Sequence, residues 1–121
     1  IVLNLNMDMV SRNDKNEIYV CGTSHYPFLK KYVDSVRSNT PVHILFGHDD
    51  AAGGHDDWTS QSDHYSFHKK QVPFLYFGVE DHPDYHRATD TYDKINKQFY
   101  YQVSQAITSL VELLDRQPVL R

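Results

Sequence analysis

The chain has 121 residues, of which 40% are hydrophobic and 23% are charged, the composition of one folded domain rather than of a disordered segment. Its formal net charge of -4, with no Lys/Arg cluster longer than two residues, argues against nucleic acid as a partner. No apolar run approaches the length that spans a bilayer, and the single cysteine excludes an internal disulfide. The chain begins inside an apolar run without an initiating Met, so we expect it to be cut from something longer.

Strand and helix signals alternate along the chain, which predicts the α/β class. The predicted strands cover residues 1–9, 17–21, 42–46 and 72–79. The last of these, VPFLYFGV, is continuously apolar and is therefore expected at the centre of the sheet. The predicted helices follow Ser24, cover residues 63–70 and follow Asn96.

Two of these helices have recognisable start signals. Ser24 is expected to cap the first helix, because Pro27 is tolerated in a first helical turn. Asn96 is expected to cap the last helix, which has one apolar stripe made of Phe99, Val103, Ile107, Leu110 and Leu114. Both helices are predicted to pack against the sheet.

Six of the eight histidines fall between His48 and His86. The apolar strand at 72–79 leads directly into a loop that contains Asp84, Tyr85 and His86. In α/β proteins, sites lie at the carboxyl ends of strands, and a neutral imidazole is a common zinc ligand. This loop is therefore a candidate site, although a loop histidine is more often simply solvated.

Other polar residues have an ordinary interpretation beside a functional one. Asp8 stands where the first strand gives way to a turn, and turn carboxylates commonly accept backbone hydrogen bonds. The HDD sequences at 48–50 and 55–57 lie in a glycine-containing loop and are expected to be solvated or substrate-facing. Asp63, His64 and Tyr76 are candidate substrate-pocket residues, but Asp63 can cap the helix after it, His64 can be a structural histidine and Tyr76 can pack in the core.

Three segments together resemble the co-catalytic zinc aminopeptidases of the MH clan, which include bacterial leucyl aminopeptidases. These segments are NLNMDMVSRN, the run SDHYSFHKKQVPFLYFGVEDHPDYHRATDT and the closing helix. The resemblance covers essentially the whole chain. It implies a three-layer α/β/α fold with an incomplete sheet, in which residues 1–121 are the carboxy-terminal portion of a zinc peptidase domain.

The resemblance also implies roles for individual residues. Asp8 would bind one zinc ion, His86 would bind the second, and Tyr85 would help to stabilise the oxyanion. Two zinc ions can activate water and polarise a scissile carbonyl, so the intact enzyme would hydrolyse the amino-terminal peptide bond of peptides. Ser11 stands where relatives usually have glycine, which is a departure in the turn after Asp8.

Other residues of the family have no counterpart in this chain. These are an upstream histidine, an aspartate that bridges both metals, a glutamate ligand and an adjacent glutamate general base. We therefore expect weak or absent zinc binding and no peptidase activity from the isolated chain, because metal binding and site formation are coupled. An incomplete sheet also exposes a strand edge, which predicts self-association or a dimer.

Two alternative functions stay open. A non-catalytic relative could keep this scaffold as an interaction domain, without turning over peptides. A glutaminyl cyclase resembles the same fold but usually has tryptophan where Tyr85 stands. The aminopeptidase resemblance further implies an exported or periplasmic protein.

Overall fold

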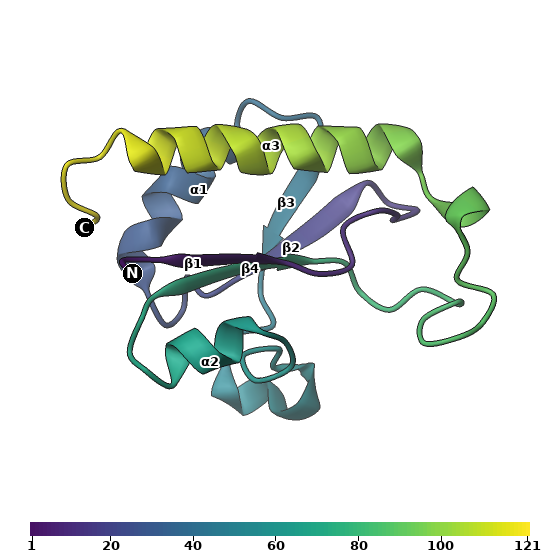
Figure 1. Cartoon of the computed structure of the whole chain (residues 1–121), viewed down its shortest axis with the longest axis horizontal. Coiled ribbons are helices and arrows are strands. Elements are labelled where there is room, and N and C mark those ends of the chain that lie inside the picture. Colours follow the sequence, from purple (N-terminus) through teal and green to yellow (C-terminus); the bar gives the residue numbers. More distant parts are fainter.

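A computed structural model of the chain describes residues 1–121, apart from the side chains of residues 53–55. Its centre is a mixed sheet with the spatial order β1-β4-β2-β3 (Figure 1). The strands are β1 (Asn4–Met7), β2 (Glu17–Cys21), β3 (His43–Phe46) and β4 (Phe74–Gly78). β1 pairs with β4 in parallel, β2 pairs with β3 in parallel, and β2 pairs with β4 in antiparallel orientation. The predicted α/β class is confirmed.

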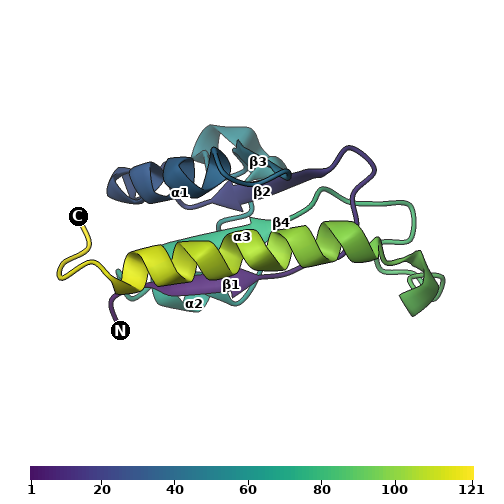
Figure 2. The ribbon, with the colours of Figure 1, turned by 90° about the horizontal axis from the view of Figure 1, so that it is seen from above.

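Helices cover both faces of this sheet, which gives three layers. One layer contains α1 (Lys30–Arg37) and α3 (Lys97–Asp115), and the other contains α2 (His64–His68) and the 3-10 helix η2 (Ala51–Asp56) (Figure 1). Seen from above, α3 lies over β1 and β4, whereas α1 lies beside β2 and β3 (Figure 2). Two shorter 3-10 helices, η1 (Pro27–Leu29) and η3 (Tyr92–Lys94), complete the described elements.

β4 is the central strand, as its apolar sequence predicts. All five of its residues are buried, because helices pack on both of its faces. Leu75 and Phe77 join the main core under α1 and α3, whereas Phe74 and Tyr76 join a smaller cluster on the α2 side. The alternation of strand side chains thus divides one apolar run between two cores.

The predicted cap of the last helix is confirmed. Asn96 has an extended backbone, and its side chain accepts a hydrogen bond of 3.0 Å from the main-chain nitrogen of Phe99. The predicted apolar stripe of α3 is buried against the sheet and α1: Phe99, Val103, Ile107, Leu110 and Leu114. Local capping and helical periodicity are sufficient to predict this element.

The predicted cap of the first helix is wrong. α1 begins at Lys30, after η1, and neither of these helices has a side-chain cap. The Ser24 hydroxyl and main-chain nitrogen instead bind the carboxylate of Asp49, at 2.9 and 3.1 Å, and the nitrogen of Gly22 binds the same carboxylate at 2.7 Å. Asp49 is only 3% exposed, and a buried carboxylate requires such donors.

The second predicted helix is shorter than the expected residues 63–70, since α2 covers only His64–His68. Asp63 occupies the position before it, but its side chain makes no capping hydrogen bond. No helix among the described residues is both long and apolar enough to cross a membrane.

Histidines gather in the layer below the sheet. The rings of His25 and His68 lie 4.8 Å apart, and His68 is hydrogen-bonded to the hydroxyl of Tyr26 at 2.8 Å. Burial lowers the pKa of both His64 and His68, and the charge of His25 lowers that of His68 further. These two side chains are therefore neutral in the folded protein at neutral pH.

We expect the fold to lose stability as the solution is acidified from about pH 7 to about pH 5. A histidine with a lowered pKa binds fewer protons in the folded chain than in the unfolded chain, so protons favour unfolding below the ordinary value of about 6.5. Thermal melts at both pH values should show a smaller fall in melting temperature for His68→Gln than for the wild type. His43→Gln, on the exposed side of β3, is the matched control, and equal falls in all three proteins would contradict the prediction.

Candidate functional site

The candidate site forms where β1 and β4 end. Because these neighbouring strands are parallel, their carboxyl ends meet at one edge of the sheet. Asp8 directly follows β1, and its main-chain nitrogen donates to the carbonyl of Phe77 at 3.0 Å. The nitrogen of Val79 donates to the carbonyl of Met9 at 3.0 Å, so the two chains stay side by side as they leave the sheet.

Asp84 ties the loop after β4 to the segment after β1. Its carboxylate accepts hydrogen bonds of 2.8 Å from both Arg12 and Lys94. Hydrogen bonds from Lys94, Thr89 and Arg12 hold the pKa of Asp84 well below its usual range, so it is ionised at neutral pH. We call Arg12, Asp84 and Lys94 the Asp84 triad. Because Arg12 lies four residues after Asp8, this triad brings the segment after Asp8 next to the segment that carries Tyr85 and His86.

Asp8 presents one oxygen without a partner. Its Oδ2 accepts a hydrogen bond of 3.0 Å from the hydroxyl of Ser62, and no other hydrogen bond reaches its carboxylate within the described residues. The Tyr76 hydroxyl donates to the main-chain carbonyl of Asp8 at 3.4 Å. Asp8 is exposed, so Oδ1 is available to a cation.

The backbone of β4 lies so close to Asp8 that position 78 requires glycine. A Cβ atom on Gly78 would come within 2.8 Å of the Asp8 carbonyl oxygen and 2.7 Å of the Tyr76 hydroxyl. The main chain of Asp8 thus packs directly against the end of β4.

Tyr85 and His86 lie together on the loop after β4. Their rings stack, with centroids 3.9 Å apart, and His86 is exposed. His86 has a left-handed φ of 56°, and Met9, next to Asp8, has a φ of 60°. Non-glycine residues adopt this conformation uncommonly, and such positions cluster at functional sites.

Tyr76 connects the two loops electrostatically. Burial raises its pKa most, followed by the charge of Asp8, and the charges of Cys21 and Tyr85 add to the effect. Asp8 and Tyr85, which belong to different loops, therefore both lie within electrostatic range of the same buried hydroxyl.

The donors at this edge suit zinc in type but not in number. Carboxylate oxygen and imidazole nitrogen are ordinary zinc ligands, and Asp8 and His86 both offer an exposed atom. However, the described residues contain no group of three or more His, Cys, Asp or Glu side chains that could hold a metal ion. Asp8 and His86 can supply part of a ligand set, which other residues would have to complete.

The predicted pocket residues lie in different environments. Asp63 is exposed, Tyr76 is 7% exposed and His64 is fully buried. The two His64 nitrogens face the carbonyl of Trp58 at 2.9 Å and the side-chain nitrogen of Asn6 at 3.4 Å. Tyr76 and His64 therefore lie behind Asp8 rather than in an open pocket, and contact with substrate stays a prediction for all three.

Sequence reasoning missed Asn6 and Ser62, which lie between His64 and Asp8. The signals are present in the sequence, because Asn6 and Asp8 are two positions apart in an extended segment and Ser62 opens the SDH motif.

The first HDD sequence is predicted to be solvated or to face a substrate, but its Asp49 is buried. His48 is stacked on Trp58 with ring centroids 3.8 Å apart. In the second HDD sequence, the side chain of His55 lies outside the described residues.

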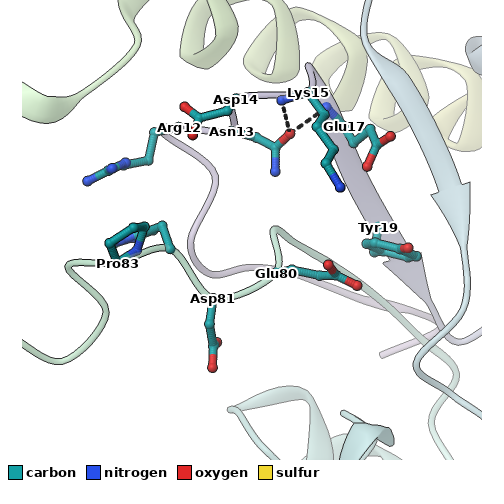
Figure 3. Close-up of a pocket in the computed structure, with 10 residues that line it drawn as sticks. Arg12, Asn13, Asp14, Lys15, Glu17, Tyr19, Glu80, Asp81 and Pro83 are labelled. Carbon is teal, nitrogen blue, oxygen red and sulfur yellow. Dashed lines mark hydrogen bonds between the residues drawn. The ribbon is translucent and has the colours of Figure 1, made fainter.

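A small cavity of about 170 Å³ lies beside the same edge of the sheet (Figure 3). Lys15 lines it from the connection between β1 and β2, Glu17 lines it from the start of β2, and Glu80 lines it from the segment after β4. Burial raises the pKa of Tyr19, which also lines the cavity, and the charges of Glu80 and Glu17 raise it further. Cations and carboxylates mix on these walls, so the cavity does not indicate one class of ligand.

Residues 1–111 match the family described as peptidase family M28. This chain belongs to that family. Two crystal structures of BSAP, a zinc aminopeptidase from Bacillus subtilis, have a similar fold, with TM-scores of 0.69 and 0.70 and sequence identities of 20% and 21%. The similarity covers 93% of this chain, which spans 28% of the length of those proteins. No curated protein sequence matches the chain.

These findings confirm the predicted resemblance as far as the M28 peptidase family and the fold. At 20–21% identity, the BSAP structures show that this M28 chain shares their architecture. The roles predicted for Asp8, Tyr85 and His86 are separate statements about chemistry and stay predictions.

Proposed function

We propose that this chain forms the carboxy-terminal part of the catalytic domain of a zinc aminopeptidase. The observation that carries the proposal is that Asp8 follows β1, that the loop with Tyr85 and His86 follows its parallel neighbour β4, and that the ion pair of Arg12 with Asp84 fastens these two segments together. Membership of peptidase family M28 and the fold shared with the zinc aminopeptidase BSAP support it.

In this proposal, Asp8 and His86 each hold one of two zinc ions. The bound ions would polarise the scissile carbonyl and lower the pKa of the attacking water. Ser62 orients the Asp8 carboxylate, and the phenol of Tyr85 donates a hydrogen bond to the carbonyl oxygen as negative charge develops on it. The substrate is a peptide with a free amino terminus.

The other zinc ligands and the general base are proposed to come from parts of the enzyme that this chain does not contain. Support comes from the donor count, because no metal-binding group of three or more ligands exists in the described part of the chain. The chain also spans only 28% of the BSAP structures. The isolated chain should therefore bind zinc weakly and hydrolyse no peptide.

The decisive test measures zinc content and leucyl-anilide hydrolysis for the isolated chain and the full-length protein side by side. We expect about two zinc ions and turnover in the full-length protein only. A full-length protein without zinc and without turnover would remove the aminopeptidase proposal and favour a non-catalytic interaction domain.

We also propose that the isolated chain self-associates. β1 is an edge strand, and apolar side chains stand exposed around it: Val2 is 76% exposed and Met7 is 53% exposed. Unpaired strand edges recruit further strands. Light scattering should show a dimer or larger species for the isolated chain, and a strictly monomeric species at high concentration would count against it.

A further inference from the structure

His64 is buried behind the candidate metal ligand Asp8. It is fully buried on α2, with its ring 4.7 Å from that of Phe74 and 4.6 Å from that of Tyr76. Both of its nitrogens nevertheless have polar neighbours. A buried imidazole with two partners is held in one orientation, and each partner constrains which nitrogen carries the hydrogen.

The partners determine the direction of every hydrogen bond between His64 and Asp8. The carbonyl of Trp58 can only accept, so His64 Nε2 carries the hydrogen and Nδ1 must accept. The side-chain nitrogen of Asn6 lies 3.4 Å from Nδ1 and 3.2 Å from the Ser62 oxygen, so its two hydrogens serve these two acceptors. The Ser62 hydroxyl is then free to donate to Asp8 Oδ2, at 3.0 Å.

The orientation of the Asn6 amide decides whether this sequence of bonds exists. With its nitrogen toward Ser62, the amide donates and the serine hydrogen points to Asp8. With its oxygen toward Ser62, the amide would accept the serine hydrogen and Asp8 would lose its partner. Because Nδ1 of His64 is an acceptor, it favours the first orientation.

We propose that His64 is a positioning residue of the metal centre, which fixes the Asn6 amide so that the Ser62 hydroxyl binds Asp8 Oδ2 and leaves Oδ1 for the metal. This inference rests on the proposed zinc aminopeptidase function and adds a residue to it that touches neither metal nor substrate. Replacing groups that orient metal ligands in this way typically lowers metal affinity by about 10- to 100-fold.

The protonation state of His64 agrees with this arrangement. Burial lowers its pKa, against smaller opposing effects from the Trp58 carbonyl and other neighbours. The ring is therefore neutral at neutral pH, with one donor and one acceptor, which is the state that the hydrogen-bond directions require.

The test uses the full-length zinc-loaded enzyme with His64→Phe and His64→Asn. Phenylalanine keeps the ring packing but removes both polar atoms, whereas asparagine keeps an acceptor near the position of Nδ1. Zinc affinity, measured by competition with a chromophoric chelator, should fall about 10- to 100-fold in His64→Phe and be largely restored in His64→Asn. The visible spectrum of the cobalt-substituted enzyme should change in His64→Phe and should be largely restored in His64→Asn. Ser66→Ala, on the exposed side of α2, is the matched control.

Asn6→Asp provides a second variant, which leaves the packing of the His64 ring on Phe74 and Tyr76 in place. The new carboxylate has the shape of the amide but no hydrogens to donate, so Ser62 would donate to it rather than to Asp8. Zinc affinity should fall as in His64→Phe, and the double variant should lose no more than the larger single loss, since residues in one hydrogen-bond network are not additive.

Two outcomes would overturn the inference and can be told apart. If the wild-type enzyme binds two zinc ions and both His64→Phe and Asn6→Asp keep its zinc affinity and cobalt spectrum, His64 has no positioning role but the aminopeptidase function stands. If the wild-type enzyme binds no zinc, the proposed function fails and the inference fails with it. Should His64→Phe not fold, as judged by its thermal melt, Asn6→Asp alone decides the matter.

Discussion

Replacing Asp8 by asparagine is expected to remove one of two zinc ions from the full-length enzyme and to lower kcat/KM by about a thousandfold. The amide keeps the shape of the carboxylate, but it brings no charge to Oδ1, the oxygen that Ser62 leaves free. Losing about 4 kcal/mol of carbonyl polarisation corresponds to a rate factor of that size. Elemental analysis and leucyl-anilide hydrolysis measure the two effects.

Asp14→Asn is the matched control for this experiment. Asp14 is exposed and lies in the same connection between β1 and β2, six residues after Asp8. Its substitution changes the net charge equally but leaves the Ser62 contact intact. If Asp14→Asn and Asp8→Asn lose the same activity, the effect comes from overall charge and Asp8 is no ligand.

Replacing Tyr85 by phenylalanine is expected to lower kcat by about 10²- to 10³-fold while zinc content and KM stay near their wild-type values. Phenylalanine keeps the ring that stacks on His86 but removes the hydroxyl. A hydrogen bond that strengthens as the oxyanion forms acts on the chemical step rather than on ground-state binding. Steady-state kinetics separate the two constants.

Tyr92→Phe, in η3 of the same loop, is the control for Tyr85→Phe. Tyr92 is 72% exposed, and its substitution should leave kcat unchanged. A loss of zinc in Tyr85→Phe would show that the tyrosine supports His86 structurally. An unchanged kcat would remove Tyr85 from the mechanism.

Much of the architecture can be predicted from short-range patterns. The continuous apolar run at 72–79 predicts the central strand because it must fit between two helical layers. The cap at Asn96 and the apolar stripe after it predict α3 because both depend only on residues within a few turns. The position of Asp8 and of the Tyr85–His86 pair after strands also predicts one shared edge, once the strands are known to be parallel.

The partners of these residues could not be predicted, because they are distant in sequence. Arg12 meets Asp84 across 72 positions, and Ser62 meets Asp8 across 54. The failed cap at Ser24 has the same origin, since the hydroxyl is taken by Asp49, 25 positions away. Local chemistry shows which groups need partners, but only the packed sheet determines which partner each group receives.

The Asp84 triad couples the position of the segment after Asp8 to that of the loop with His86. A single carboxylate accepts hydrogen bonds from Arg12 and from Lys94, so three residues outside the proposed zinc ligands hold the segment after Asp8 and the loop with His86 together. A change at any one of them would be transmitted to both turns at once. During evolution these three positions should therefore vary together, and a homologue that has exchanged one of them should carry a compensating exchange at the others.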